Sequence, residues 1–107
     1  MSVDNKEDIM NIRDMEYKTI DESKDLSALL DNSANLQKIF INCTFADGRP
    51  HNYVNCRFEC CAFDSVSESQ FINCTFVECK FHFNFHGKMS NCNIQKHNGY
   101  LIEGSLM

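Results

Sequence analysis

Seven cysteines and four histidines are the residues of this 107-residue chain best suited to chemistry. Structural zinc is held by Cys and His pairs that lie about two to four residues apart. Cys56 and Cys60 have three residues between them, Cys74 and Cys79 have four, and His82 and His86 have three. Taken alone, the spacing would place a zinc site near Cys79, His82 and His86.

A nucleophilic side chain needs an activating group and a cleft around it. The chain has no G-x-S-x-G motif and, with four glycines, no glycine-rich phosphate-binding loop. A histidine base on a strand face, His82 or His86, is the catalytic alternative. We expect a protein that is not an enzyme.

The elements that position these residues follow a period of 18 residues. Aligned on that period, the large apolar residues fall into three columns: Phe40, Phe58, Phe76 and Ile94; Phe45, Phe63 and Phe81; and Tyr53, Phe71 and Met89. Two further columns are cysteine, and one is asparagine: Cys43, Cys61 and Cys79; Cys56, Cys74 and Cys92; and Asn55, Asn73 and Asn91.

These columns do not have the spacing of an amphipathic helix. Short strands stacked about 4.8 Å apart would instead place each column in one line. The apolar columns would fill a tube in which cysteine acts as a small hydrophobe, and the asparagines would form a ladder of amides at one corner. Because this explains six of the seven cysteines as core residues, we expect no metal site and no cofactor.

Several stretches resemble the tandem unit of pentapeptide-repeat proteins, in which Ala, Cys, Ser or Thr stands two positions before a central Leu or Phe. The clearest are Asn42-Cys43-Thr44-Phe45, Asn55-Cys56-Arg57-Phe58 and Asn73-Cys74-Thr75-Phe76-Val77-Glu78-Cys79-Lys80-Phe81. The resemblance implies an all-β fold, a right-handed, four-sided β-helix over about residues 34–94. The period of 18 departs from the four fives of a regular coil, and a left-handed β-helix made of hexapeptides is the alternative.

The chain divides by charge at residue 33. Residues 1–33 hold nine acids and four bases, which account for the whole net charge of −5. We expect an acidic, partly flexible N-terminal cap with a short helix through Leu26, Leu29 and Leu30, begun by Asp21 or Ser23. Residues 34–107 would form the repeat domain of about four coils with a degenerate last coil, in which 46–53 and 64–71 are irregular sides.

Charge and hydropathy exclude several classes of protein. The acidic balance disfavours direct nucleic-acid binding, and no apolar run is long enough to span a membrane. The N-terminus is polar and acidic, so we expect no secretory signal. Many cysteines without such a signal indicate a cytoplasmic protein.

Characterised pentapeptide-repeat proteins are largely non-enzymatic, and several mimic duplex DNA on gyrase. The resemblance therefore implies a protein-binding module that inhibits a nucleic-acid-processing enzyme, a topoisomerase or a defence nuclease, as a phage product would. We expect phosphate-like contacts from Asp14, Glu16, Asp21, Glu22 and Asp25, and a second docking patch from His82, Phe83, Phe85 and His86. The alternative is a structural, self-assembling module. The apolar C-terminal end would either meet its symmetry mate in a homodimer or fold back as its own cap.

Overall fold

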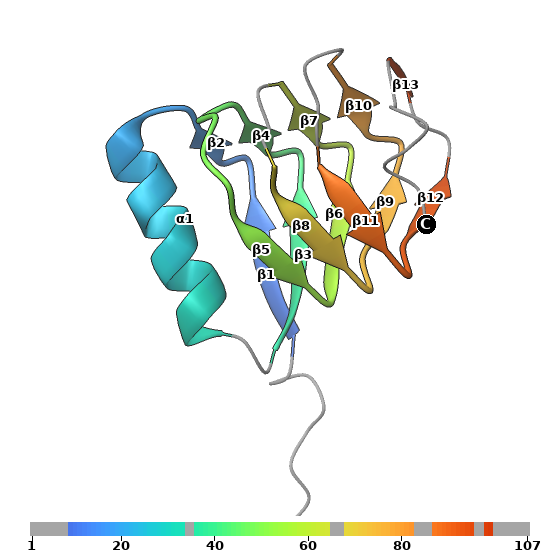
Figure 1. Ribbon diagram of the computed structural model, residues 1–107, viewed down its shortest axis with the longest axis horizontal. Helices are drawn as coiled ribbons and strands as arrows, with labels where there is room; N and C mark the ends of the chain where they lie inside the picture. The colour runs from blue at the N-terminus through green and yellow to red at the C-terminus, as the bar shows by residue number, and fades with distance from the viewer. Residues whose placement is uncertain (1–8, 34–35, 65–67, 83–86, 96–97, 100–107) are drawn as a thin grey trace, which may run out of the picture.

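The computed structural model describes residues 9–33, 36–64, 68–82, 87–95 and 98–99. In these residues the chain is mostly β, with three parallel sheets and one helix, α1 (Ile20–Asn32), as Figure 1 shows. No helix in this part of the chain is long and apolar enough to cross a membrane.

The strands of each sheet follow one another in chain order. The first sheet holds β1 (Ile9–Arg13), β3 (Gln37–Ile41), β6 (Cys56–Glu59), β9 (Thr75–Val77) and β12 (Asn93–Gln95). The second holds β2 (Glu16–Tyr17), β4 (Thr44–Phe45), β7 (Ala62–Phe63), β10 (Lys80–Phe81) and β13 (Asn98–Gly99). The third holds β5 (Asn52–Val54), β8 (Gln70–Ile72) and β11 (Lys88–Ser90).

The strand register confirms the predicted columns. From β3 onward the paired residues are 18 positions apart, as in the pairs Phe58 with Phe76, Phe45 with Phe63, and Tyr53 with Phe71. The chain visits the first, second and third sheets in turn and then returns to the first. This all-β arrangement with parallel sheets is compatible with a β-helix.

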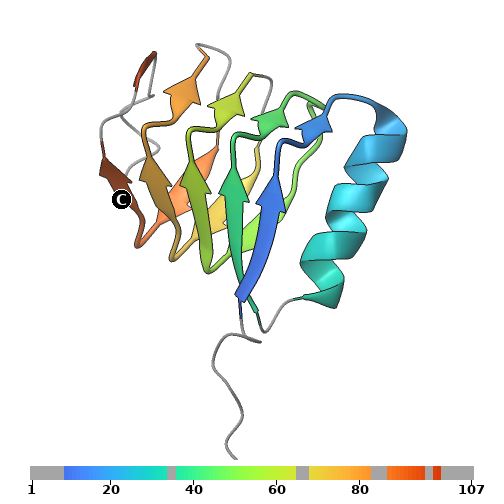
Figure 2. The ribbon, with the colours of Figure 1, turned by 180° about the vertical axis from the view of Figure 1, so that it is seen from behind.

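The first pass of the chain is longer than the others. Ile12 pairs with Phe40, an offset of 28 residues. The extra residues form α1, which follows β2 at the point where later passes place a strand of the third sheet. Figures 1 and 2 show α1 beside β5, and its Leu26 and Leu30 are buried in the core.

The predicted helix exists, but its predicted N-terminus is wrong. Asp21 and Ser23 lie inside α1, and Thr19 is the N-cap. The Thr19 hydroxyl accepts the backbone N–H of Glu22 at 3.1 Å, while the Glu22 carboxylate accepts the backbone N–H of Thr19 at 2.9 Å. This reciprocal capping box satisfies two N–H groups that a helix start leaves unpaired. A helix that began at Asp21 or Ser23 would lack this pair of hydrogen bonds.

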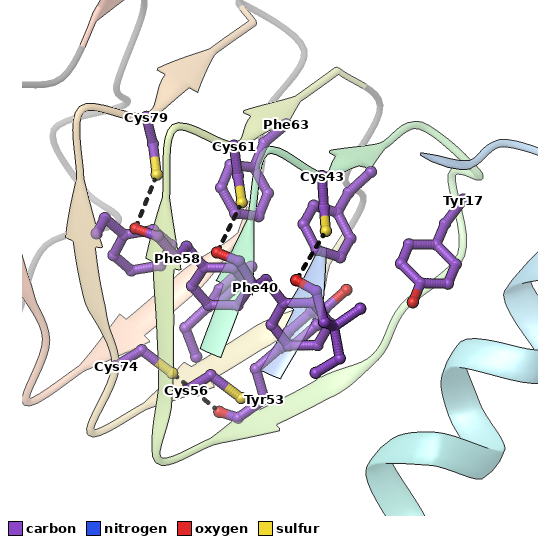
Figure 3. Close-up of a cluster of buried hydrophobic side chains, with 14 of the residues drawn as sticks. Tyr17, Phe40, Cys43, Tyr53, Cys56, Phe58, Cys61, Phe63, Cys74 and Cys79 are labelled. Carbon is purple, nitrogen blue, oxygen red and sulfur yellow. Dashed lines mark hydrogen bonds between the residues drawn. The ribbon is translucent and has the colours of Figure 1, made fainter. Parts of the chain in front are cut away.

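Aromatic rings stack along the columns and meet edge to face between them (Figure 3). The rings of Phe58 and Phe76 stack with centroids 5.0 Å apart, and those of Phe45 and Phe63 do the same at 5.0 Å. Phe58 also meets Phe63 edge to face at 5.2 Å. Both arrangements are favoured by the ring quadrupole, so the interior specifies the alignment of successive strands as well as burying them.

The asparagine column forms a corner, as predicted. Asn55, Asn73 and Asn91 all have left-handed backbones, with φ of 57°, 56° and 56°. Asparagine tolerates this conformation better than most residues because its side chain bonds locally. The Asn91 amide donates to the Asn73 side-chain oxygen, which links two successive passes.

A second corner was not predicted. Asp14, Asn42, Cys60 and Glu78 also have left-handed backbones. The Asn42 amide donates to the Asp14 carboxylate at 2.8 Å across the first two passes.

The two segments predicted to be irregular contain strands at their C-terminal ends. In 46–53 the strand β5 begins at Asn52, and in 64–71 the strand β8 begins at Gln70. Both strands form the third sheet by burying one aromatic residue each, Tyr53 and Phe71. A single inward residue gives too little alternation to reveal a strand in the sequence.

The column cysteines are core residues, as predicted, and all seven cysteines are free thiols. Cys43, Cys56, Cys61, Cys74 and Cys79 are buried, Cys92 is half-buried, and Cys60 is exposed. Hydrogen bonds with Cys43 and Cys79, together with burial, raise the pKa of the Cys61 thiol. The Cys61 thiol is therefore a poor nucleophile.

Candidate functional site

The five predicted phosphate-like carboxylates lie on consecutive elements at one end of the fold. Asp14 follows β1, Glu16 lies in β2, and Asp21, Glu22 and Asp25 lie in the first half of α1, which contacts β2. We call these five residues the acidic surface. All except the half-buried Glu22 are exposed.

The members of the acidic surface differ in the contacts they already make. The Glu16 carboxylate lies 3.4 Å from the Lys18 ammonium, and both side chains are largely exposed. The Glu22 carboxylate accepts the backbone N–H groups of Lys18 and Thr19 at 2.8 and 2.9 Å, which lower its pKa. The Glu22 carboxylate is therefore already used by the N-terminus of the helix. The ion pair between Glu16 and Lys18 is weak because both side chains are exposed, so Glu16 can exchange Lys18 for a partner's cation.

Of the second predicted docking patch, the structure describes only His82. His82 follows β10 and is half-buried, and its backbone N–H donates to the carbonyl of Phe63 at 3.0 Å. Phe83, Phe85 and His86 lie outside the described residues. Among the residues that are described, no three His, Cys, Asp or Glu side chains come together as metal ligands.

A buried hydrogen-bond cluster that the sequence did not predict joins α1 to the loop before β5. Asp47 Oδ2 lies 2.9 Å from His51 Nε2, and Ser23 Oγ lies 3.2 Å from the same nitrogen. Ser27 Oγ lies 3.1 Å from His51 Nδ1. We call Ser23, Ser27, Asp47 and His51 the His51 cluster.

The loop from Asp47 to His51 is built to present the imidazole to the helix. The Asp47 carboxylate accepts the backbone N–H of Arg49 at 3.2 Å, and Gly48 has φ of 73°, a conformation that glycine adopts without steric cost. The backbone N–H of His51 donates to Ser69 Oγ at 3.0 Å on the next pass. The imidazole is therefore held at both ring nitrogens and through its backbone.

Two cavities lie between α1 and β5. One, of about 130 Å³, is lined by Ser27, Leu30, Asp31, Pro50, His51 and Asn52. The other, of about 260 Å³, is lined by Leu30, Asp31, Lys38, Asn52 and Val54. Because they share three lining residues, the cavities are neighbours along one face of β5.

A buried lysine forms part of the wall of the larger cavity. Lys38 is 1% exposed, and its Nζ donates to the carbonyl oxygens of Ser33 and Leu36 at 2.9 Å each. Ser33 is the C-cap of α1, where the helix dipole favours a cation. Lys38 therefore anchors the end of the helix.

No protein-family model, curated protein or solved structure matches the chain. The pentapeptide-repeat resemblance therefore rests on the residues of the chain itself.

The helix sequence carried a signal for the His51 cluster. Ser23 and Ser27 share the inward face of α1 with Leu26 and Leu30. Buried hydroxyls need hydrogen-bond partners, so two serines on an apolar face predict a polar group opposite them. The sequence alone could not show that this group is His51, which lies 28 and 24 residues away from the two serines.

Proposed function

We propose that this protein is a cytoplasmic protein-binding module whose acidic surface docks onto the basic surface of a nucleic-acid-processing enzyme and inhibits it. The proposed scaffold is a right-handed β-helix of the pentapeptide-repeat type. The proposed action is binding and needs no catalytic step. The seven free thiols support the cytoplasmic location.

One observation carries this proposal. Asp14, Glu16, Asp21 and Asp25 are exposed carboxylates on adjoining elements at the end of the chain that holds the whole net charge. Duplex DNA presents one negative charge about every 1.7 Å along its axis. Carboxylates gathered at one end would therefore imitate a short stretch of phosphates, and the contact would be local.

The first experiment is capture of partners from a bacterial lysate with the tagged chain, followed by elution in a salt gradient. A DNA-processing enzyme that elutes at moderate salt supports the proposal, because exposed charges are screened by salt. The captured enzyme is then assayed for inhibition. Capture of no such enzyme, or of one whose activity is unchanged, would overturn it.

Two variants with the same change in net charge show whether inhibition depends on the acidic surface or only on the charge of the whole protein. The test variant carries Asp14→Asn, Glu16→Gln, Asp21→Asn and Asp25→Asn, and it keeps Glu22 so that the helix cap survives. The control variant changes four other exposed acids by the same charge: Asp31→Asn, Asp64→Asn, Glu68→Gln and Glu78→Gln. We expect the test variant to lose inhibition and the control to retain it. Equal inhibition by both would exclude the acidic surface as the binding site.

A structural, self-assembling module is the second candidate. Cys92 and Ile94 are half-buried, whereas the preceding residues of their columns, Cys74 and Phe76, are at most 1% exposed. Apolar contacts at that end would join two copies in a two-fold interface. A dimer in size-exclusion chromatography that persists in high salt and dissociates on Ile94→Asp supports this candidate, while a monomer at every concentration excludes it.

A further inference from the structure

We propose that Ser27, His51 and Asp47 form a nucleophilic-serine site that hydrolyses small acyl esters in the cavities between α1 and β5. This activity is separate from the proposed binding function, because no residue of the acidic surface takes part in it. Ser27 is the nucleophile, His51 the base, and Asp47 a positioning residue.

The distances give each residue its role. Ser27 Oγ lies 3.1 Å from Nδ1 of His51, and Asp47 Oδ2 lies 2.9 Å from Nε2 on the opposite side of the ring. A nucleophile bonded to a base, which is itself oriented by a third group, is the arrangement that activates serine.

The carboxylate fixes where the imidazole proton lies. An ionised carboxylate only accepts hydrogen bonds, so the Nε2 atom beside Asp47 carries the proton in the neutral ring. Nδ1 is then an acceptor, and the Ser27 hydroxyl donates to it. This tautomer is the one that can take the Ser27 proton during attack.

Exposure distinguishes the two serines of the cluster. Ser23 is 2% exposed and bonds the Nε2 side of the ring. Ser27 is half-buried and lines the cavity of about 130 Å³. The side chains of His51 and Asp47 are 3% and 4% exposed, so the charge that develops on them is shielded from water, where electrostatic stabilisation is stronger.

The strand β5 supplies a donor for the oxyanion. The backbone of His51 bonds toward β8, since its carbonyl accepts the N–H of Gln70 at 2.9 Å. Successive residues of a strand direct their backbone groups to opposite edges, so Asn52 directs its N–H toward α1. Asn52 lines both cavities, and its N–H there would stabilise a tetrahedral intermediate.

The reaction needs water as its only co-reactant. Ser27 Oγ bonds to the acyl carbon while its proton passes to His51 Nδ1, and the ester C–O bond then breaks as that proton moves to the leaving alcohol. Water attacks the acyl-serine in the same way, releasing a carboxylic acid and restoring Ser27. The cavity of about 130 Å³ suits a short acyl group, and Leu30 and Val54 in the neighbouring cavity suit an apolar alcohol.

The test uses the full chain, with p-nitrophenyl acetate as substrate and a fluorophosphonate as covalent probe. We expect hydrolysis above background and one probe adduct, located by mass spectrometry on the peptide that contains Ser27. Ser27→Ala should abolish both, and alanine keeps the helix because of its high helix propensity. Ser90→Ala, on the exposed face of β11, is the matched control and should retain both.

The role of Asp47 needs a readout that a structural role would not move. Asp47→Asn should lower kcat by about tenfold or more with little change in KM, because it disturbs the tautomer, and Asp47→Glu should recover part of kcat. Circular dichroism confirms that each variant is folded. Three outcomes would overturn the proposal: no adduct in the wild-type chain, an equal adduct in Ser27→Ala, or an unchanged kcat in Asp47→Asn. The hydrogen bonds of the His51 cluster would then only hold α1 against the loop before β5.

Discussion

The Sγ atom of Cys79 lies 3.3 Å from the carbonyl oxygen of Phe58, a residue 21 positions earlier in the chain. Cys61 has the same relationship with Phe40 at 3.2 Å, and Cys74 with Tyr53 at 3.4 Å. Each thiol therefore donates to the preceding pass while its sulfur fills core volume. A cysteine combines these two roles because it is a small hydrophobe with a weak donor.

Thiol burial predicts an order of chemical reactivity. With a thiol-specific disulfide reagent on the native protein, we expect Cys60 to react first because it is exposed. Local desolvation and the nearby Glu78 carboxylate raise the pKa of Cys60, so this phase should be slower than for a free cysteine. The half-buried Cys92 should follow, and denaturant should release all seven thiols. Loss of the first phase in Cys60→Ser checks the assignment, and simultaneous reaction of all thiols in native buffer would contradict it.

Alkaline pH should destabilise the fold. The hydrogen bond with Cys56, together with burial, raises the pKa of Cys74 to about 12, and burial raises the pKa of Tyr17 to about 12. The folded state then binds these protons more tightly than the unfolded state, so their stabilisation is complete below the unfolded pKa values of about 9 and 10 and is lost as pH approaches 12.

Urea unfolding between pH 7 and 11 measures this effect. The denaturation midpoint should fall above about pH 9, and Cys74→Ala should make the fall shallower, because it removes one titrating group. Ser90→Ala, on the exposed face of β11, removes no titrating group, so it serves as the control and should leave the pH dependence close to that of the wild type. A midpoint that is flat up to pH 11 would contradict the prediction.

Truncation at the centre of the ring stacks should be the most damaging single change in the core. Phe58 is fully buried and stacks on both Phe40 and Phe76, at 5.2 and 5.0 Å. Phe58→Ala should cost about 3–5 kcal/mol of unfolding free energy. Thr75→Ala, on the outward side of β9, should cost far less. Urea unfolding of both variants checks this, and similar losses in the two would contradict it.

The left-handed corners predict opposite effects for two substitutions. Asn73→Ala should cost about 1 kcal/mol or more, because alanine disfavours φ of 56° and lacks the amide that bonds Asn91. Cys60→Asn should instead raise the denaturation midpoint, because asparagine tolerates φ of 55° better than cysteine. Differential scanning calorimetry of both variants is the measurement, and a Cys60→Asn protein less stable than the wild type would argue against it.

The repeat made much of the fold predictable. A strict period fixes which residues share a column, so the alignment of Phe58 with Phe76 and the asparagine corner follow from sequence alone. The helix was predictable from Leu26 and Leu30, whereas its cap was not, because Thr19 acts through a reciprocal bond with Glu22.

The His51 cluster was not predictable, because it depends on how α1 lies against a loop from the following pass. Hydrogen bonds between residues 24 and 28 positions apart leave no periodic trace. The acidic surface was predictable as a stretch of charge. Only the structure shows that Glu22 caps the helix and so differs from the other four carboxylates.

The replacement of one strand by α1 has a consequence for growth into filaments. At the end of the fold where the described chain begins, β1 and β2 offer strand edges, but α1 stands where the third sheet would offer one. A copy stacked head to tail could continue two sheets and would meet a helix at the third. Head-to-tail contacts that do not close into a ring produce fibres. By occupying the edge of the third sheet, α1 therefore hinders the addition of further copies, and a plain 18-residue repeat would lack this protection.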